Sequence, residues 1–255
     1  MEDEKKTFTG MKENHIEGRN AVLEAFRSGR TIDKLYVLDG CQDGPVRSIT
    51  REARKHDTIV NYVTKARLDL ISETGKHQGV IAVSAAYDYA RVEDILALAE
   101  KKGEPPFILI LDGIEDPHNL GAIIRTANQA GAHGVIIPKR RAVGLTPTVA
   151  RTSAGAVNYV PVAKVTNISN TMKELKDRGM WFVCADMDGT LMYDMDLTGP
   201  IGLVIGNEGD GVSPLVKKNC DMVASIPMKG DIDSLNASVA AGVLSYEIVR
   251  QRMKK

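Results

Sequence analysis

The stretch FILILDGIEDPHNLGAIIRTANQAGAHGVIIP, residues 107–138, decides the fold. It contains two apolar runs, Phe107–Leu111 and Gly134–Pro138, on either side of a helical pattern over Leu120–Ala130. A short apolar run without polar alternation is typical of a strand that is buried on both faces, as in a parallel sheet. Two such strands joined by a helix predict a strand–helix–strand unit and therefore an α/β fold.

The same rhythm continues towards the carboxyl end of the chain. Further apolar runs predict strands at Tyr159–Val162, Trp181–Ala185, Ile201–Ile205 and Val223–Pro227. Helical patterns are expected at Thr146–Ala154, Ser169–Arg178, Ser213–Asn219 and Leu235–Arg252. These elements extend the predicted sheet, which we expect to be mostly parallel with helices between its strands.

A second, smaller unit is expected upstream of this sheet. Helical and strand patterns alternate there, at Arg19–Ser28, Lys34–Leu38, Pro45–His56, Ile59–Val63 and Val80–Ala85. The stretch Gly103–Pro106 then breaks regular structure, after a helical pattern over residues 87–102. We therefore expect an amino-terminal α/β domain over residues 14–88, a linker over 89–106 and a carboxyl-terminal domain over 107–255.

The composition argues against membrane spans and metal-binding cysteines. Of 255 residues, 43% are hydrophobic, yet no run approaches the roughly 18 apolar residues that a membrane span needs. The charged opening Met1–Lys6 is unlike a signal peptide. Cys41, Cys184 and Cys220 are odd in number and far apart, so they predict neither a disulfide framework nor a zinc site. We expect a cytoplasmic protein that binds no metal.

The net charge does not by itself indicate a nucleic-acid partner. Basic and acidic residues number 33 each, for a net charge of +0, so any RNA-binding surface must be local. Its best candidate is the run Lys139–Arg141, with Arg151 and Lys164 further on. The simpler interpretation of such a run is a solvated surface.

The first candidate site is the polar loop Asp112–Gly121, which follows a predicted strand and leads into the helix that carries Arg125. Ligands of open α/β sheets bind at the carboxyl ends of strands, which favours this position for chemistry. The alternative is structural, with Asn119 as a helix cap and Arg125 as a surface ion-pair partner.

Two further loops follow predicted strands. The loop Ile205–Gly211 is rich in glycine, which lets a ligand approach the backbone closely, although a tight turn uses glycine as well. Its Glu208 favours a functional role, because turn geometry alone does not call for a carboxylate there. In the loop Ile226–Ser238, Ser234 or Asn236 is expected to cap the final helix.

A competing motif lies at Asp186–Thr190, which matches the Asp-x-Asp-x-Thr signature of dehalogenase-type phosphatases. In that class the first aspartate is the nucleophile and the second a general acid. The class carries the motif on its first strand, however, and the residues after Leu191 are too few for the remaining units. We keep this hypothesis as a remote alternative.

Taken in order, the three loops resemble the signature motifs of the SpoU/TrmH family of SPOUT RNA methyltransferases. The matching segments are Asn119–Ala127, Leu203–Gly209, and Ile226–Met228 with Ser234–Ala240. Upstream, Gly18–Ala25 and His77–Val80 resemble an L30e-like RNA-binding domain of the bacterial 23S rRNA guanosine 2′-O-methyltransferase subgroup. The resemblance covers nearly the whole chain.

This resemblance implies a trefoil knot at the carboxyl end, a rare exception to the rule against threaded chains. It also implies a homodimer whose active sites use both subunits. S-adenosyl-L-methionine would lie against Gly206, Ile226, Met228 and Leu235, and the ribose would be faced by Asn119, Arg125, Glu208, Ser234 and Asn236. Arg125 is the candidate for activating the ribose hydroxyl. Because arginine is a poor base, binding of a phosphate and polarisation of the hydroxyl stay open as its role.

The implied function is S-adenosylmethionine-dependent 2′-O-methylation of RNA, with a guanosine in 23S rRNA as the expected target. The nearest alternatives are tRNA ribose methylation and antibiotic-resistance methylation of rRNA. A non-catalytic RNA-binding scaffold is an alternative from another class. The intact set of polar residues in the three loops argues against it.

Overall fold

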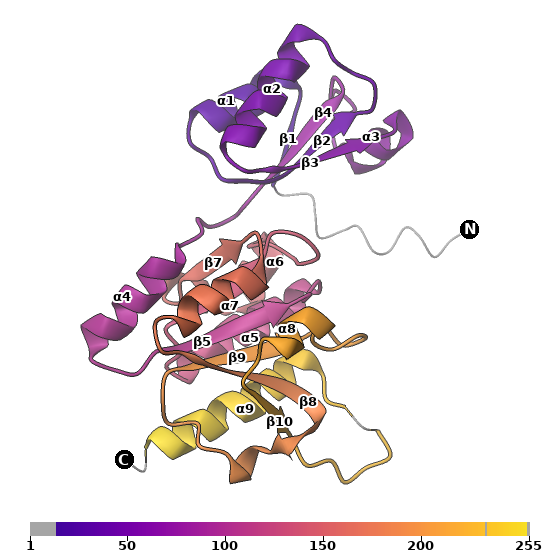
Figure 1. The fold of residues 1–255 in the computed structure, drawn as a ribbon. Helices are drawn as coiled ribbons and strands as arrows, with labels where there is room; N and C mark the ends of the chain where they lie inside the picture. The colour runs from indigo at the N-terminus through magenta and orange to yellow at the C-terminus, as the bar shows by residue number, and fades with distance from the viewer. Residues whose placement is uncertain (1–13, 233, 254–255) are drawn as a thin grey trace. The chain divides into compact units, whose positions relative to one another are not determined.

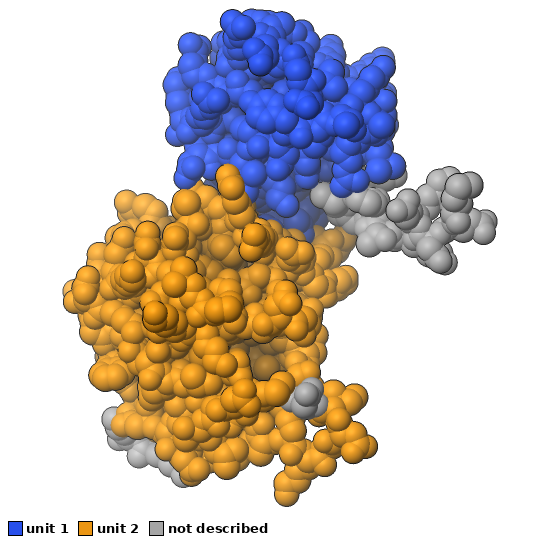
Figure 2. Space-filling model, turned by 45° about the vertical axis from the view of Figure 1, so that its right-hand side comes forward, with its two compact units in different colours: residues 1–88, 144–147 blue, residues 89–143, 148–255 orange. Residues whose placement is uncertain are grey.

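The computed structural model describes residues 14–232 and 234–253. The opening run Met1–Lys6 lies outside these residues. The chain folds as two compact units, which Figure 2 shows in different colours. The first comprises residues up to Asp88 with Gly144–Pro147, and the second comprises Tyr89–Val143 and Thr148–Lys255.

The amino-terminal unit is a four-stranded sheet with helices. Its elements are β1 (His15–Glu17), α1 (Arg19–Arg27), β2 (Ile32–Leu38), α2 (Gly44–Lys55), β3 (Ile59–Val63), α3 (Lys65–Ile71) and β4 (Val80–Ser84). The strand order is β1-β4-β2-β3, in which only β2 and β3 pair in parallel. Apolar side chains of α1, α2, β2 and β4 form its core, among them Phe26, Leu35 and Ile49. The sequence did not predict β1 or α3.

The carboxyl-terminal unit is built on a six-stranded parallel sheet in the order β10-β8-β9-β5-β6-β7 (Figure 1). Its strands are β5 (Phe107–Asp112), β6 (Gly134–Pro138), β7 (Val162–Val165), β8 (Trp181–Leu191), β9 (Ile201–Gly206) and β10 (Met222–Ser225). Its helices are α4 (Val92–Lys102), α5 (Pro117–Gln129), α6 (Pro147–Thr152), α7 (Ile168–Lys176), α8 (Pro214–Lys218) and α9 (Ala237–Arg252), with short 3-10 turns η3 (Ala156–Asn158) and η4 (Met192–Asp194). The predicted α/β class is confirmed.

Helices cover both faces of this sheet. Residues of α4, α7 and α8, such as Ile95 and Met172, pack with Ile110 and Phe182 of the strands in one core cluster. Helices α5 and α9 contact each other, and α9 also contacts β9. Because both faces are covered, β5, β6 and β9 are buried along nearly their whole length.

Two expected segments differ from the structure. The proposed linker, residues 89–106, contains α4, and its Ile95 is fully buried in the core of the carboxyl-terminal unit. The expected strand Tyr159–Val162 instead begins at Val162, because Gly155 has a left-handed backbone and a 3-10 turn follows it. Tyr159 is accordingly 76% exposed. No helix within the described ranges is long and apolar enough to cross a membrane.

A fully buried histidine joins α4, β5 and β6 at the start of the sheet. The Phe107 N–H donates to His133 Nδ1 at 3.0 Å, and His133 Nε2 lies 3.1 Å from Glu104 Oε2. Burial holds the pKa of His133 below its usual value. The imidazole is therefore neutral in the folded protein, with Nδ1 as an acceptor.

We expect this histidine to make stability depend on pH. Because its folded-state pKa is lowered, the unfolded chain binds more protons, so the free energy of unfolding should fall as the pH drops below about 6.5. Urea unfolding at about pH 7.5 and about pH 5.5 measures this loss. His133→Asn keeps an acceptor for Phe107 and should shrink the loss. The exposed control His118→Asn should leave it unchanged, and equal pH dependence in all three proteins would contradict the assignment.

Candidate active site at the carboxyl edge of the sheet

Two loops of the candidate site leave the sheet side by side. Strands β5 and β9 pair in register as far as Asp112, which lies opposite Gly206. Asp112 Oδ2 then accepts a hydrogen bond of 2.8 Å from the Ser213 N–H, which ties the end of β5 to the start of α8, just after the turn that follows β9. The loops that the sequence singled out therefore start from one edge of the sheet.

Asn119, Glu208 and Asn236 form a hydrogen-bonded group, here called the amide–carboxylate cluster. Asn119 Nδ2 donates to Glu208 Oε1. Asn236 Nδ2 donates to Asn119 Oδ1 at 3.0 Å and to Glu208 Oε1 at 3.2 Å. The cluster joins α5, the turn after β9 and the start of α9, although its members lie 28 to 117 positions apart in the chain.

The two asparagines differ in their structural roles. Asn119 is not a helix cap, because Asp116 caps α5 by accepting a hydrogen bond from the His118 N–H. It lies inside the helix and is only 6% exposed, so its side chain is committed to the cluster. Asn236 does cap α9, as expected, since its Oδ1 accepts from the backbone N–H groups of Ser238 and Val239. Its amide nitrogen simultaneously serves the cluster.

The turn after β9 is shaped by its own side chains. Asn207 Oδ1 accepts hydrogen bonds from the N–H groups of Gly209 and Asp210, at 2.9 and 2.6 Å. A Cβ at Gly206 would overlap the backbone of Gly211 and Val212. The chain's own packing therefore requires the glycine at this position, which is the tight-turn interpretation of the two that the sequence left open.

A cavity of about 430 Å³ opens beside this turn. It is lined by all four residues expected to contact the cofactor, Gly206, Ile226, Met228 and Leu235, together with Glu208 and Ser234. Met228 and Leu235 are each 37% exposed, although both are large apolar side chains. The cavity thus combines apolar walls with a few polar groups, as small-molecule sites do.

Arg125 is the one predicted site residue that stands apart. It is exposed on α5 and neither lines the cavity nor joins the cluster. Arg125 shares a helix face with Gly121, one turn earlier. A Cβ at Gly121 would overlap the side chain of Thr152, so this face of α5 packs against α6.

Family models match both units of the chain. The model of the SpoU rRNA methylase family matches residues 106–246, more than half of the chain. The chain belongs to the SpoU rRNA methylase family. A second model, RNA 2′-O ribose methyltransferase substrate binding, matches residues 15–90. The predicted family and enzyme class are thereby confirmed.

Relatives with similar sequences carry names of the same family. The chain is 48% identical over 240 residues to the Bacillus subtilis protein YacO, assigned to the TrmH family of tRNA/rRNA methyltransferases, and the match covers 94% of this chain and 96% of YacO. A relative from Staphylococcus saprophyticus with the same family assignment is 47% identical, with coverage of 95% and 97%.

Solved structures of the family share the fold. The SpoU methyltransferase AviRb from Streptomyces viridochromogenes, in complex with AdoMet, matches with a TM-score of 0.61 and 28% identity, over 94% of this chain and 91% of AviRb. An AdoMet-bound rRNA methyltransferase from Sinorhizobium meliloti matches with a TM-score of 0.58 and 25% identity, over 93% and 87%. A further structural match, at a TM-score of 0.53 and 26% identity over 94% and 88%, is an RNA 2′-O ribose methyltransferase.

The residues of the phosphatase-like motif belong to strand β8 and to the wall of the cavity in this SpoU-family chain. Strand β8 runs on through Asp186–Thr190, where the pairing of β10 shifts from Cys184 to Thr190. Asp186 and Met187 line the cavity. The sequence does not predict this position, because their motif indicates phosphatase chemistry instead. Asp186 is also ion-paired with Lys217 at 2.7 Å, and this hydrogen bond lowers the pKa of the carboxyl.

Family membership and this geometry argue against the phosphatase hypothesis. The motif lies on β8, the fourth strand of the carboxyl-terminal sheet along the chain, whereas that class carries it on the first strand. Across the described residues, no group of three or more His, Cys, Asp and Glu is placed to hold a metal ion.

We expect Gly206→Ala to destabilise the carboxyl-terminal unit by about 1–3 kcal/mol, because the added methyl group meets backbone that no rotamer change can clear. Urea unfolding measures the loss. Gly209→Ala is the matched control in the same turn, since its Cβ would meet only Asn207 Oδ1, at 3.7 Å. Equal stability of the two variants would show that the close approach at Gly206 is not a constraint.

Proposed function

We propose that the protein transfers a methyl group from S-adenosyl-L-methionine to a ribose 2′-hydroxyl of RNA. The observation that carries this proposal is the cavity at the carboxyl edge of the sheet, with the amide–carboxylate cluster on its border. Membership of the SpoU family, and the AdoMet in two structural relatives, support it. RNA and S-adenosylmethionine are both abundant in the cytoplasm, where we place the reaction.

The cavity suits the cofactor in size and chemistry. Its volume of about 430 Å³ is in the range of sites for small molecules. Met228 and Leu235, which are exposed around it, offer apolar surface to an adenine ring, and the backbone of Gly206 and Ile226 offers hydrogen bonds to its edge. S-adenosylmethionine, when bound there, supplies an electrophilic methyl group on its sulfonium.

The amide–carboxylate cluster is proposed to orient the ribose. Glu208 and Ser234 are exposed and line the cavity, and Asn236 is joined to Glu208 by its hydrogen bond. A ribose hydroxyl ionises far above neutral pH, so it must be aligned with the methyl group and lose its proton as the new bond forms. Buried Asn119 is proposed to fix Glu208 for this task. Contacts to the 2′-hydroxyl would also select RNA over DNA.

Arg125 is proposed to act on the site of a second subunit. The guanidinium of an arginine keeps its proton at neutral pH, so it cannot accept one from the ribose hydroxyl. Its several N–H donors are well arranged to bind a phosphate. Arg125 lies outside its own chain's cavity, so a homodimer in which each site receives the partner's arginine would account for its position. Helix α9 supports a dimer, because it leaves Val239 and Tyr246 exposed, at 48% and 52%.

The proposal also assigns a role to each domain and a place to the knot. We assign residues 14–88 to an L30e-like RNA-binding domain, supported by the substrate-binding model that matches residues 15–90. We assign residues 107–255 to the methyltransferase domain. The proposed trefoil knot would lie where the Ile226–Leu235 segment and the turn after Gly206 line one cavity.

A guanosine in 23S rRNA is the proposed target, supported by the rRNA methylase family model and by the rRNA methyltransferase from Sinorhizobium meliloti. The names of the bacterial relatives also include tRNA, which keeps tRNA as the second candidate. We expect one ribose methylation in 23S rRNA to disappear from cells that lack the protein. Mapping of ribose methylation in rRNA and tRNA, with and without the gene, tests this. A change confined to tRNA would replace the target, and no change in either RNA would contradict the function.

We expect Arg125→Ala to abolish methyl transfer while leaving S-adenosylmethionine affinity nearly unchanged, because Arg125 does not line the cavity. Calorimetry and single-turnover methylation on one preparation measure the two effects. The matched control is Arg178→Ala, an exposed arginine that follows α7. If Arg125 were a surface ion-pair residue, its loss would cost no more than about 1 kcal/mol of stability and little activity.

The shared site has a sharper test. Arg125→Ala and Glu208→Gln are both expected to be inactive alone, but a mixed dimer of the two holds one site with both natural residues. Equal amounts of the two variants, unfolded and refolded together, should therefore regain about a quarter of the natural activity. No recovery would place Arg125 and Glu208 in the site of one chain.

A further inference from the structure

A second cavity lies in the amino-terminal unit. Its volume is about 510 Å³, and it is lined by Arg19, Leu38, Cys41, Gln78 and Gly79. These residues come from the start of α1, the end of β2 and the loop before β4. The cavity thus combines apolar walls with one guanidinium and one carboxamide.

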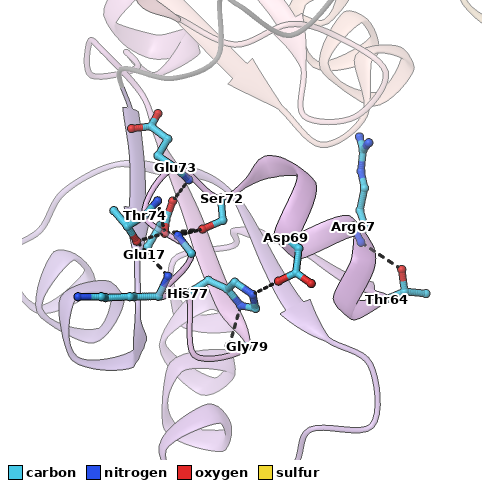
Figure 3. A network of polar contacts seen from close by, with 11 residues as sticks. Glu17, Thr64, Arg67, Asp69, Ser72, Glu73, Thr74, His77 and Gly79 are labelled. Atoms are coloured by element: carbon cyan, nitrogen blue, oxygen red, sulfur yellow. Dashed lines mark hydrogen bonds and ion pairs between the residues drawn. The ribbon is translucent and has the colours of Figure 1, made fainter. Parts of the chain in front are cut away.

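The loop that carries Gln78 is held on both sides. Figure 3 shows Glu17 beside Ser72 and Thr74 of this loop, and His77 within the loop pointing toward Asp69. The Glu17 carboxylate accepts hydrogen bonds from the hydroxyls of Ser72 and Thr74. His77 is buried, its Nε2 lies 2.9 Å from Asp69 Oδ1, and its Nδ1 accepts the Gly79 N–H at 3.0 Å. Residues 72–79 are therefore rigidly placed.

Gln78 itself has an unfavourable backbone. Its φ is +51°, in the left-handed region that glycine adopts far more readily. Such a conformation persists only where the surroundings impose it, and strained residues of this kind gather at functional sites. Its side-chain oxygen accepts the Arg19 N–H at the start of α1, which helps to hold the residue in this conformation and leaves its amide nitrogen available to a ligand.

Arg19 is fixed by the same loop. Its backbone N–H donates to Gln78 Oε1 and its Nε donates to Gln78 O, both at 3.1 Å. A terminal nitrogen of the guanidinium lies 2.6 Å from Asp43 Oδ2. Asp43 is held in turn as the N-cap of α2. The guanidinium is thus held by two contacts, and its charge is balanced by a carboxylate.

We propose that this cavity binds an unpaired nucleobase of the RNA, stacked on the guanidinium of Arg19. The proposal rests on the proposed function, in that the ligand is RNA. A planar guanidinium held in place by hydrogen bonds is a stacking surface for bases. The Gln78 amide nitrogen makes no hydrogen bond to any residue within 14–232 and 234–253, so it is placed to donate to the edge of the base.

The charge of the cavity favours a base over a phosphate. The pairing with Asp43 neutralises Arg19, so the cavity offers little attraction to a phosphate. Leu38 and Cys41 provide apolar walls that a phosphate would not use. A paired base is buried in its helix, so only an unpaired nucleotide can enter.

The test compares RNA affinities of the full chain without cofactor. The probe is a fluorescein-labelled hairpin RNA with an unpaired loop of mixed sequence, measured beside a duplex of its stem. Arg19→Ala and Gln78→Gly should each weaken hairpin binding by roughly tenfold, as the loss of one stacked base does. Neither should change duplex binding. Ala154→Gly is the matched control, because Ala154 also has a left-handed backbone, with φ +49°, but lies in the other unit.

Gln78→Gly separates function from structure. Relief of strain and loss of the hydrogen bond to the Arg19 N–H have opposite effects on stability. The variant should therefore stay folded while hairpin affinity falls, and urea unfolding beside the binding titration measures both. Natural hairpin affinity in this variant would overturn the proposal. A second result would also overturn it. If the plot of log affinity against log salt concentration were shallower by about 0.7 in Arg19→Ala than in the natural protein, Arg19 would be contacting a phosphate.

The result is distinguishable from a failure of the proposed function. RNA affinity is measured here without S-adenosylmethionine, so a protein that binds the hairpin through Arg19 but transfers no methyl group would contradict only the reaction. A protein that methylates RNA and binds hairpin and duplex equally well would contradict only the base-binding cavity.

Discussion

The register between β5 and β9 is the constraint on which the candidate site depends. These two strands pair without a shift from Phe107 and Ile201 to Asp112 and Gly206. Because both are buried along almost their whole length, a slip by one residue would disturb the core on both faces of the sheet. The hydrophobic core therefore sets the position of the turn that carries Glu208 relative to the helix that carries Asn119. The polar cluster is a consequence of apolar packing.

Much of this arrangement was predictable from the sequence. Apolar runs locate strands that are buried on both faces, and five of the six strands in the parallel sheet lie within a residue or two of their predicted starts. The exception, β7, begins at Val162, because the left-handed Gly155 directs the chain into a turn that no hydrophobic pattern reveals. Strand β1 and helix α3 are short and gave no periodic signal of sufficient length.

The loops of the candidate site could be located from the sequence, but the contacts between their side chains could not. The loops around Asn119, Glu208 and Asn236 stood out because polar residues follow buried strands or precede helices. Their mutual hydrogen bonds depend on how three distant elements pack, which sequence spacing does not encode. Asp186 shows the reverse case, since its motif was noticed but its place on the cavity depends on the shift in pairing between β8 and β10. The role of Gly206 likewise required the backbone of Gly211 to be seen beside it.

Asn236 illustrates how narrowly one position can be specified. Its oxygen accepts the first N–H groups of α9, while its nitrogen donates to Asn119 and Glu208. An aspartate would cap the helix equally well, but it would bring a second negative charge against Glu208 and lose the donor. A serine or threonine would cap it too, but its single hydroxyl cannot replace both the accepting oxygen and the donating nitrogen of Asn236. Among the residues that begin helices well, only asparagine supplies both an acceptor for α9 and a donor for the cluster. This position therefore tolerates a single amino acid.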